Sequence, residues 1–277
     1  MNLKKSKLGL LLALALVMLV TLAACGSTKS SQDNSLQKIK AKKTIVLGTS
    51  ADAAPFEFPI MQNGAKKIVG YDVMVAKKIA KSIGVKLEIE NIAFPSLISE
   101  LQDKKVDFIL AGMVANKQRK KVVAFSKPYH YAKFTVLLRK GEEKKFSSLS
   151  SFKGAAIGAQ QSSVPQKLAQ QQLKGANLVV ESSLNTLTTE LLNGKLDGIA
   201  IGKDSADMYV KKFPDKYAIS KVRLKASTDV SAVSVAVRKS DKTLLKKINQ
   251  EITRLDKNGQ LTKMYQQAQD LQMKYGK

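Results

Sequence analysis

Residues 106–131 read VDFILAGMVANKQRKKVVAFSKPYHY. The segment begins with an apolar run, Val106 to Ala111, whose length suits a strand buried on both faces. Gly112 ends the run and permits a close approach of the backbone. Arg119 follows in a polar turn beyond the strand, where its guanidinium offers a carboxylate two parallel donors, a geometry that lysine lacks. The residues alone leave two interpretations of Arg119 open, a carboxylate site or a solvated surface charge.

The composition is typical of a globular protein, but the charge is unusual. The chain has 277 residues, 44% of them hydrophobic and 25% charged, so it can bury a sizeable core and form two lobes. The formal net charge of +25 favours anionic neighbours such as nucleic acid, lipid head groups or cell-wall polymers. Tryptophan is absent and the lysines are spread along the chain, which argues against nucleic-acid binding. A solvated basic surface facing an anionic envelope is the favoured interpretation.

The cysteine and histidine counts exclude several chemistries. A single cysteine, Cys25, allows no intramolecular disulfide and no multi-cysteine metal site. A single histidine, His130, argues against histidine-rich metal sites and against a Ser-His triad. We therefore expect no metal and no cofactor, and interpret His130 as a packing or surface residue in a turn.

The first 40 residues have the pattern of an export signal followed by a tether. Lysines among the first seven residues precede an apolar segment, 8–20, that is too short to span a membrane as a helix. Leu22-Ala23-Ala24-Cys25 then resembles the lipobox of bacterial lipoproteins. The resemblance implies a signal peptide over 1–24 and a diacylated Cys25 that anchors the protein to the extracytoplasmic face of the cell membrane. The alternative is an uncleaved anchor with an incidental cysteine. Residues 25–40 are polar and predict a flexible tether.

Hydrophobic periodicity predicts alternating strands and helices. A strand at 44–48, a helix at 71–83, a strand at 86–90 and a short helix after Pro95 favour a mainly parallel α/β lobe. Farther on, the pattern predicts strands at 134–139, 155–159 and 232–237, and helices at 165–174, 204–212, 242–257 and 261–269. Phe125 to Tyr129 is expected to form a turn.

An internal echo indicates two similar lobes. Glu100-Leu101, Lys105, Asp107, Ile109 and Gly112 recur in the same spacing as Glu190-Leu191, Lys195, Asp197, Ile199 and Gly202. Each segment ends a predicted helix, begins a buried strand and finishes at a glycine. Because open α/β sheets bind ligands beyond the carboxyl ends of their strands, we expect both glycines at a cleft between the lobes.

Three short motifs within residues 106–131 show a family resemblance. They are Ala111-Gly112-Met113, Arg119-Lys120-Lys121 and Phe125-Ser126-Lys127-Pro128-Tyr129. Together they resemble the first-lobe signature of bacterial solute-binding proteins for polar amino acids, the extracytoplasmic subunits of ABC importers, and the likeness extends over about residues 41–270. It implies an α/β, two-lobed, periplasmic-binding-protein-like (type II) fold with two hinge crossovers. Lobe 1 would comprise 41–132 plus 231–277, and lobe 2 would comprise 133–230.

The resemblance also implies a set of ligand-binding residues. Arg119 would bind a carboxylate, helped by backbone amides near Gly112 and Val114 and by the helix start at Ser163 and Val164, while Phe94 would form an apolar wall. Ser163 is also a plausible N-cap, and free amides at a helix start can bind an anion. At Gly202 the family usually has an acidic residue that pairs with the α-ammonium group. Asp204 or Asp52 could replace it, or Asp204 could simply begin a helix. Ala53, Val114 and Ser162 also depart from the family pattern.

These observations predict a lipid-anchored, non-enzymatic binding protein. It would capture a polar amino acid or a related small carboxylate and deliver it to an ABC permease and its ATPase. A ligand without an α-ammonium group is a further hypothesis, prompted by Gly202. Two alternatives remain: a cell-surface adhesin or wall-associated protein on the same fold with a degenerate pocket, and an enzyme, for which no acid–base pair is evident.

Overall fold

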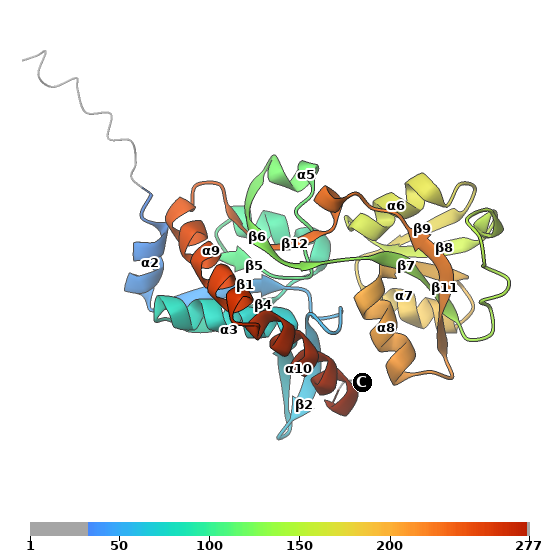
Figure 1. The fold of residues 1–277 in the computed structure, drawn as a ribbon, viewed down its shortest axis with the longest axis horizontal. Coiled ribbons are helices and arrows are strands. Elements are labelled where there is room, and N and C mark those ends of the chain that lie inside the picture. Colours follow the sequence, from blue (N-terminus) through green and yellow to red (C-terminus); the bar gives the residue numbers. More distant parts are fainter. Residues whose placement is uncertain (1–32, 276–277) are drawn as a thin grey trace, which may run out of the picture. The chain divides into compact units, whose positions relative to one another are not determined.

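Two five-stranded sheets, each covered by helices, make up most of the part of the chain that the structure describes, residues 33–275 without the side chain of residue 229 (Figure 1). The structure is a computed structural model. The chain from Asn34 onward forms one compact unit of its own. The predicted signal peptide, Cys25 and the first part of the predicted tether lie outside the described residues. Over residues 33–275, no helix has the length and apolar character needed to cross a membrane.

The first sheet belongs to lobe 1 and is parallel over three neighbouring strands. Its order is β4 (Lys86–Asn91), β1 (Thr44–Thr49), β5 (Phe108–Ile109), β12 (Ala232–Arg238) and β6 (Val123–Tyr131). β1 is parallel to both β4 and β5, whereas β12 is antiparallel to β5 and β6. Alternate residues of β1 face opposite sides, as a strand requires. Ile45 and Leu47 join the core under α3 (Tyr71–Ile83) and α9 (Lys242–Lys257), and Val46 joins a smaller cluster with α4 (Leu97–Gln102).

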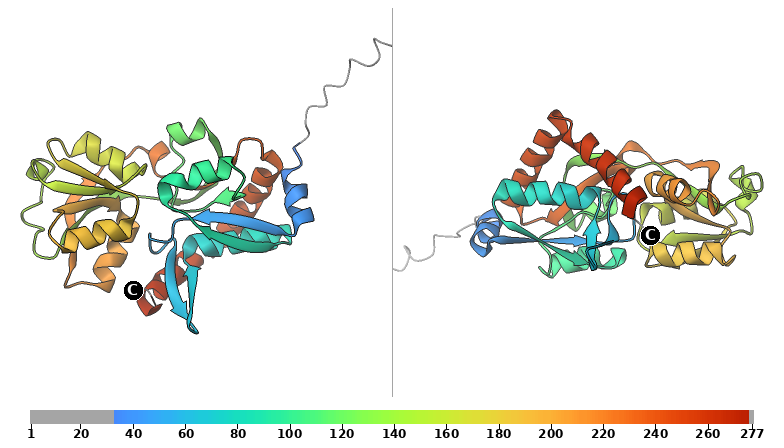
Figure 2. Two further views of the ribbon diagram at one scale, coloured as in Figure 1. Left: turned by 180° about the vertical axis from the view of Figure 1, so that it is seen from behind. Right: turned by 90° about the horizontal axis from the view of Figure 1, so that it is seen from below.

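The remaining elements of lobe 1 lie around this sheet. A hairpin of β2 (Phe58–Gln62) and β3 (Ala65–Val69), which the sequence analysis missed, lies beside α10 (Gln260–Tyr275), as Figure 2 shows. α10 continues six residues past the predicted end of the last helix. The short elements η1 (Phe94–Ser96) and α5 (Lys117–Lys120) follow β4 and β5 and reach the cleft described below.

The second sheet forms lobe 2. Its order is β11 (Tyr217–Leu224), β7 (Phe134–Arg139), β10 (Gly198–Gly202), β8 (Ala156–Gln160) and β9 (Asn177–Glu181). It is covered by η2 (Ser150–Phe152), α6 (Val164–Gln172), α7 (Leu184–Leu192) and α8 (Lys203–Lys212). The chain passes from the first sheet to the second between β6 and β7. It returns between β11 and β12 through η3 (Thr228–Val230). These two adjacent crossings give the hinge geometry of a protein that closes on a ligand.

Two predictions about local structure were wrong. Phe125 to Tyr129 lies inside strand β6 and not in a turn. Pro128 is compatible with a strand here because β6 is the edge of its sheet and the pairing with β12 is irregular beside it. The predicted tether also extends too far, because Ser35–Lys42 form helix α2.

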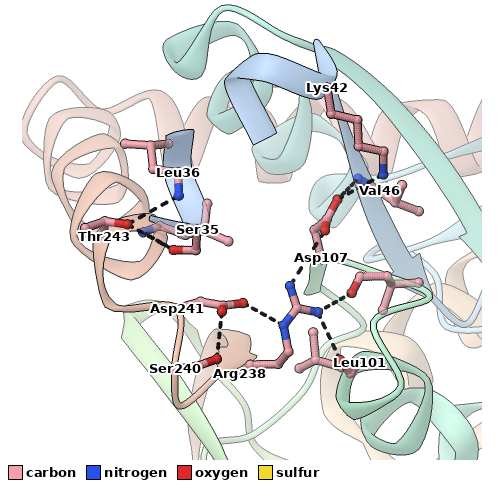
Figure 3. Close-up of polar contacts among 12 residues, drawn as sticks. Ser35, Leu36, Lys42, Val46, Leu101, Asp107, Arg238, Ser240, Asp241 and Thr243 are labelled. Carbon is pink, nitrogen blue, oxygen red and sulfur yellow. Dashed lines mark hydrogen bonds and ion pairs between the residues drawn. The ribbon is translucent and has the colours of Figure 1, made fainter. Parts of the chain in front are cut away.

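Figure 3 shows how α2 is fixed to lobe 1. The hydroxyls of Ser35 and Thr243 lie 3.0 Å apart. Thr243 Oγ1 also accepts a bond from Leu36 N at 3.3 Å, and Ser35 Oγ accepts one from Leu244 N at 3.3 Å. Each hydroxyl therefore satisfies an amide at the start of the other helix, which replaces water as the partner of that exposed donor. The polar sequence concealed this contact, since a cap made by a residue more than 200 positions away leaves no local pattern.

The sequence echo corresponds to the same construction in both lobes. Asp107 Oδ2 accepts a hydrogen bond from Val46 N at 2.9 Å, and Asp197 Oδ2 accepts one from Ala156 N at 2.9 Å. Each aspartate also lies 3.7 Å from an arginine, Arg238 or Arg139. Arg238 donates to the carbonyls of Leu101 and Val106, and Arg139 donates to the equivalent Leu191 and Leu196 (Figure 3 for lobe 1). The paired arginine and aspartate thus fix the loop before β5 and before β10, and so set the positions of Gly112 and Gly202.

Candidate functional site

A cavity of about 80 Å³ lies between the lobes, beyond the carboxyl ends of β5 and β10. This is where open α/β sheets bind ligands. Eight of the nine residues that the sequence analysis proposed as ligand contacts line it: Phe94, Gly112, Val114, Arg119, Ser163, Val164, Gly202 and Asp204. Asp52 lines a neighbouring cavity of about 340 Å³ instead.

Arg119 is a buried cation with no acidic partner among the described residues. Its side chain belongs to α5, where Asn116 caps the helix by accepting a bond from Arg119 N at 2.9 Å. Only 8% of Arg119 is exposed. Its guanidinium donates to the carbonyls of Val114 at 2.8 Å and Ser162 at 2.9 Å, and lies 5.2 Å from the centre of the Phe94 ring. Burial lowers the pKa of Arg119 to about 10, so the group stays charged at neutral pH.

Backbone amides beside Arg119 add donors. Ala115 N and Ser234 N make the bonds that join this segment to β12, and Val114 N between them has no acceptor among the described residues. Across the cleft, Ser163 caps α6 by accepting a bond from Gln166 N at 3.1 Å, as the sequence predicted. Val164 N, at the first position of that helix, likewise lacks an acceptor in the described part of the chain. Val114, Val164 and Arg119 line one small cavity from opposite lobes, so their amides and guanidinium together suit an anion.

The amide of Gly112 is not available to a ligand, although the sequence analysis expected amides near Gly112 to help bind a carboxylate. Gly112 instead sets the course of the backbone at the base of the cavity. Its N–H donates to Asp72 Oδ2 at 2.7 Å, so it is not available to a ligand. Asp72 Oδ1 accepts a bond from the Tyr129 hydroxyl at 2.9 Å. Gly112 has φ +54, a conformation that favours glycine. The buried Asp72 therefore holds the backbone at the base of the cavity.

Glu57 is a second buried acid at this base. It is 1% exposed, and neither of its carboxyl oxygens has a hydrogen-bond partner among the described residues. Burial, and then the charge of Asp72, raise the pKa of Glu57 well above its usual range. Burial also raises the pKa of Asp72, although its bonds from Gly112 and Tyr129 counteract this. Both shifts have the direction expected for two neighbouring buried carboxyl groups, because two buried negative charges close together would be costly.

Asp52 joins the lobes at the rim of the cleft. Its Oδ2 accepts bonds from Leu184 N at 2.9 Å and Gln160 Nε2 at 3.2 Å, both in lobe 2. Burial raises the pKa of Asp52, and the bond from Leu184 opposes the shift. Because these donors occupy the carboxylate, Asp52 acts in this arrangement as a contact between the lobes at the start of α7.

Gly202 and Asp204 lie on the lobe 2 side of the cavity. A side chain added at Gly202 would meet no atom within 4 Å, so the glycine leaves open space where a larger residue would fit. Asp204, in the first turn of α8, lines the cavity and contacts two lobe 1 residues. Its Oδ2 lies 3.2 Å from His130 Nε2, and its Oδ1 accepts a bond from the Tyr265 hydroxyl at 2.5 Å. Burial tends to raise the pKa of Asp204, but the bonds from His130 and Tyr265 outweigh it and lower the pKa, so Asp204 is negatively charged.

His130 and several cavity residues have roles that the sequence did not reveal. The His130 ring stacks on Tyr265 with centres 5.0 Å apart and packs edge-on against Phe56, so the histidine is a packing residue in a strand. Phe134, Leu184 and Ile201 give the cavity apolar walls. Phe134 and Ile201 belong to β7 and β10, and the rule that strand ends border the cleft could have indicated them. Tyr265 comes from the C-terminal helix, and no sequence pattern connects it to the cleft.

No group of three or more metal-ligating side chains occurs in the part of the chain that is described.

The raised pKa of Glu57 gives a pH-dependent prediction. Because the pKa of Glu57 is raised on folding, the folded chain holds a proton that the unfolded chain releases above about pH 4.5, so this group lowers stability as pH rises. Glu57→Gln removes the titration and keeps the shape. Denaturant unfolding between about pH 4.5 and 8 should show the variant gaining stability relative to the parent as pH rises. The exposed Glu90→Gln serves as the control. Parallel curves for Glu57→Gln and the parent would contradict a neutral Glu57.

The comparisons with known proteins agree with this fold. The model of the bacterial extracellular solute-binding proteins, family 3, matches residues 45–269. The arginine-binding extracellular protein ArtP of Bacillus subtilis is 34% identical over 263 residues, which cover 92% of this chain and 95% of ArtP. The L-cystine-binding protein TcyJ of Escherichia coli is 28% identical over 250 residues, which cover 90% of this chain and 91% of TcyJ.

Solved structures show the same relationship. The crystal structure of an amino acid ABC transporter substrate-binding protein from Streptococcus pneumoniae, bound to L-arginine, has a TM-score of 0.82 and 33% identity. The alignment covers 85% of this chain and 98% of the pneumococcal protein. The two-lobed α/β fold expected from the sequence is therefore confirmed. The chain belongs to the bacterial extracellular solute-binding proteins, family 3, which bind solutes and are not enzymes.

Proposed function

We propose that this protein captures an amino acid, or a related small carboxylate, between its lobes and delivers it to an ABC permease. The observation that carries the proposal is Arg119, a guanidinium that is 8% exposed and has no acidic partner among the described residues. An unpaired buried charge is costly, so such a group is retained where a ligand supplies the opposite charge. The arginine and cystine bound by the relatives named above are both α-amino acids, which supports this class.

The remaining polar groups divide between the two ends of such a ligand. Val114 N and Val164 N would join Arg119 at the carboxylate. Asp204 is the acidic residue of the cavity lining and is negatively charged, so it is the group that would take an α-ammonium. His130 and Tyr265 hold it from the other lobe. In this proposal Asp204 replaces the acidic residue that is missing at Gly202, two positions earlier.

The first test is a thermal-shift screen of the chain from Gly26 onward with amino acids, their deaminated analogues and short peptides. A ligand at about a hundred times its Kd adds about 2.7 kcal/mol to the free energy of unfolding, a rise of about 5–10 °C in Tm. Arg119→Lys keeps the charge but loses the paired donors, and it should weaken binding about a hundredfold. The exposed Arg223→Lys is the matched control. Binding by Arg119→Lys within about threefold of the parent would refute the site. If no compound stabilises the protein, the alternative of an adhesin or wall-associated protein with a degenerate pocket would be favoured.

The proposed role of Asp204 as the ammonium partner is tested separately. Asp204→Asn removes the negative charge, so the ratio of affinities for an amino acid and for its deaminated analogue should fall about tenfold. Tyr265→Phe removes the hydroxyl bound to Asp204 but keeps the charge, and should leave this ratio nearly unchanged. Titration calorimetry measures both affinities. An unchanged ratio in Asp204→Asn would exclude Asp204 as the ammonium partner. A parent protein that binds only the deaminated compounds would instead mean that Gly202 marks a ligand without an α-ammonium group.

We also propose that Cys25 carries the lipid anchor. The support is the lipobox-like Leu22-Ala23-Ala24-Cys25 after an apolar segment, together with membership of an extracellular family. Two acyl chains on one cysteine are enough for stable attachment. Metabolic labelling with an alkyne fatty acid should mark the parent protein and leave Cys25→Ala unlabelled. Cys25→Ala should leave the membrane fraction, and its retention there together with labelling would rule out this anchor.

A further inference from the structure

Five lysines surround a shallow groove of about 710 Å³ at the end of lobe 1 where α2, α3 and β4 meet. They are Lys40, Lys43, Lys77, Lys81 and Lys86. All five are exposed. The floor between them includes Ala80, Val85 and Leu87, and no acidic residue lines the groove. Glu88 forms an ion pair with Lys86 at 3.5 Å, and both side chains are exposed. The groove therefore carries a dense cluster of positive charges.

Local helix chemistry explains only part of this cluster. Lys40 and Lys81 lie in the last turns of α2 and α3, where a cation complements the helix dipole. Lys43 follows the end of α2, Lys77 lies in the middle of α3, and Lys86 is the first residue of β4. Three elements thus bring lysines to one place although only two of the five stabilise their own helices. A partner that contacts all five lysines together would account for Lys43, Lys77 and Lys86.

The position of α2 indicates the partner. The reciprocal contacts of Ser35 and Thr243 fix the start of α2 to lobe 1 (Figure 3). The chain therefore enters the described fold at a set point, on the helix whose last turn carries Lys40 and whose C-cap is Lys43. Ser35 lies ten positions after Cys25. A chain of that length spans at most about 35 Å, whatever its path. An anchor at Cys25 therefore keeps this end of lobe 1 close to the bilayer.

We propose that the lysine-lined groove docks lobe 1 on the head groups of an anionic phospholipid bilayer. The inference uses the anchor proposed above to bring the groove near the membrane, and does not depend on what the cleft binds. Ammonium groups act as point charges on lipid phosphates, and several within one Debye length, about 10 Å, reinforce one another. Since two acyl chains already hold the protein, the groove would orient lobe 1 on the membrane and add little to retention.

The test is co-sedimentation of the chain from Gly26 onward, which contains the whole compact unit, with vesicles. One set contains equal parts of phosphatidylglycerol and phosphatidylcholine, and the other contains phosphatidylcholine alone. The parent should bind the anionic vesicles and be released at about 0.5 M salt, where screening is strong. Lys40→Gln, Lys77→Gln and Lys81→Gln combined should weaken binding about ten- to a hundredfold. Ligand-dependent thermal shifts of this variant should match those of the parent, which separates the result from the proposed transport function.

A second basic groove supplies the matched control. Lys133, Lys221 and Lys225 are exposed lysines of a groove on lobe 2, and their replacement by glutamine removes the same charge. This control should bind the vesicles within about twofold of the parent. An equal loss in both variants would mean that net charge alone is responsible, and a loss confined to the control would place the contact on lobe 2. Equal binding to both vesicle types, or displacement by soluble glycerol phosphate at the same phosphate concentration, would also overturn the proposal.

Discussion

A guanidinium enclosed without a carboxylate is the constraint on which this structure depends. Arg119 is held by the carbonyls of Val114 and Ser162 and by the ring of Phe94, all neutral groups. These contacts fix its orientation without cancelling its charge. Burial lowers its pKa only to about 10, so the positive charge persists under physiological conditions. In the proposed function, the amides of Val114 and Val164 would join Arg119 in stabilising one anionic group.

The same groups also hold the lobes together. Arg119 reaches Ser162, Asp52 reaches Leu184, and Asp204 reaches His130 and Tyr265, and each of these contacts crosses from one lobe to the other. In the proposed function, ligand binding and closure would therefore be coupled through shared side chains. A ligand that pairs with Arg119 and Asp204 would stabilise the arrangement in which both residues also make their cross-lobe bonds. That differential contact is what a closure mechanism requires.

The sequence predicted the fold well because its signals are local and repeated. Helices α3 and α9 begin and end where hydrophobic periodicity predicted them. The repeated positions of Asp107 and Asp197 correspond to the same hydrogen bond from a backbone amide in each lobe. The strand at Pro128 was missed since a proline usually ends a strand, and only its place at a sheet edge permits it. The clustering of eight proposed residues in one cavity was predictable because strand ends and a family motif specified it.

Other features of the site could not be predicted, since they depend on distant partners. Glu57 looks like an ordinary charged residue in the sequence, and its raised pKa follows only from its burial and from the neighbouring charge of Asp72. Asp204 has the sequence context of a helix start, and its contact with Tyr265 joins positions 61 residues apart. Gly112 seemed to offer an amide, but the carboxylate that occupies it lies 40 residues earlier. In each case the pairing is a property of the tertiary structure.

The most direct measurement is a crystal structure of the protein grown with the compound that gives the largest thermal shift. Our account predicts a carboxylate in the interlobe cavity, paired through both oxygens with the Arg119 guanidinium, and an ammonium, if the compound has one, beside Asp204. A ligand bound elsewhere, or one in the cavity whose carboxylate does not contact Arg119, would contradict the central claim.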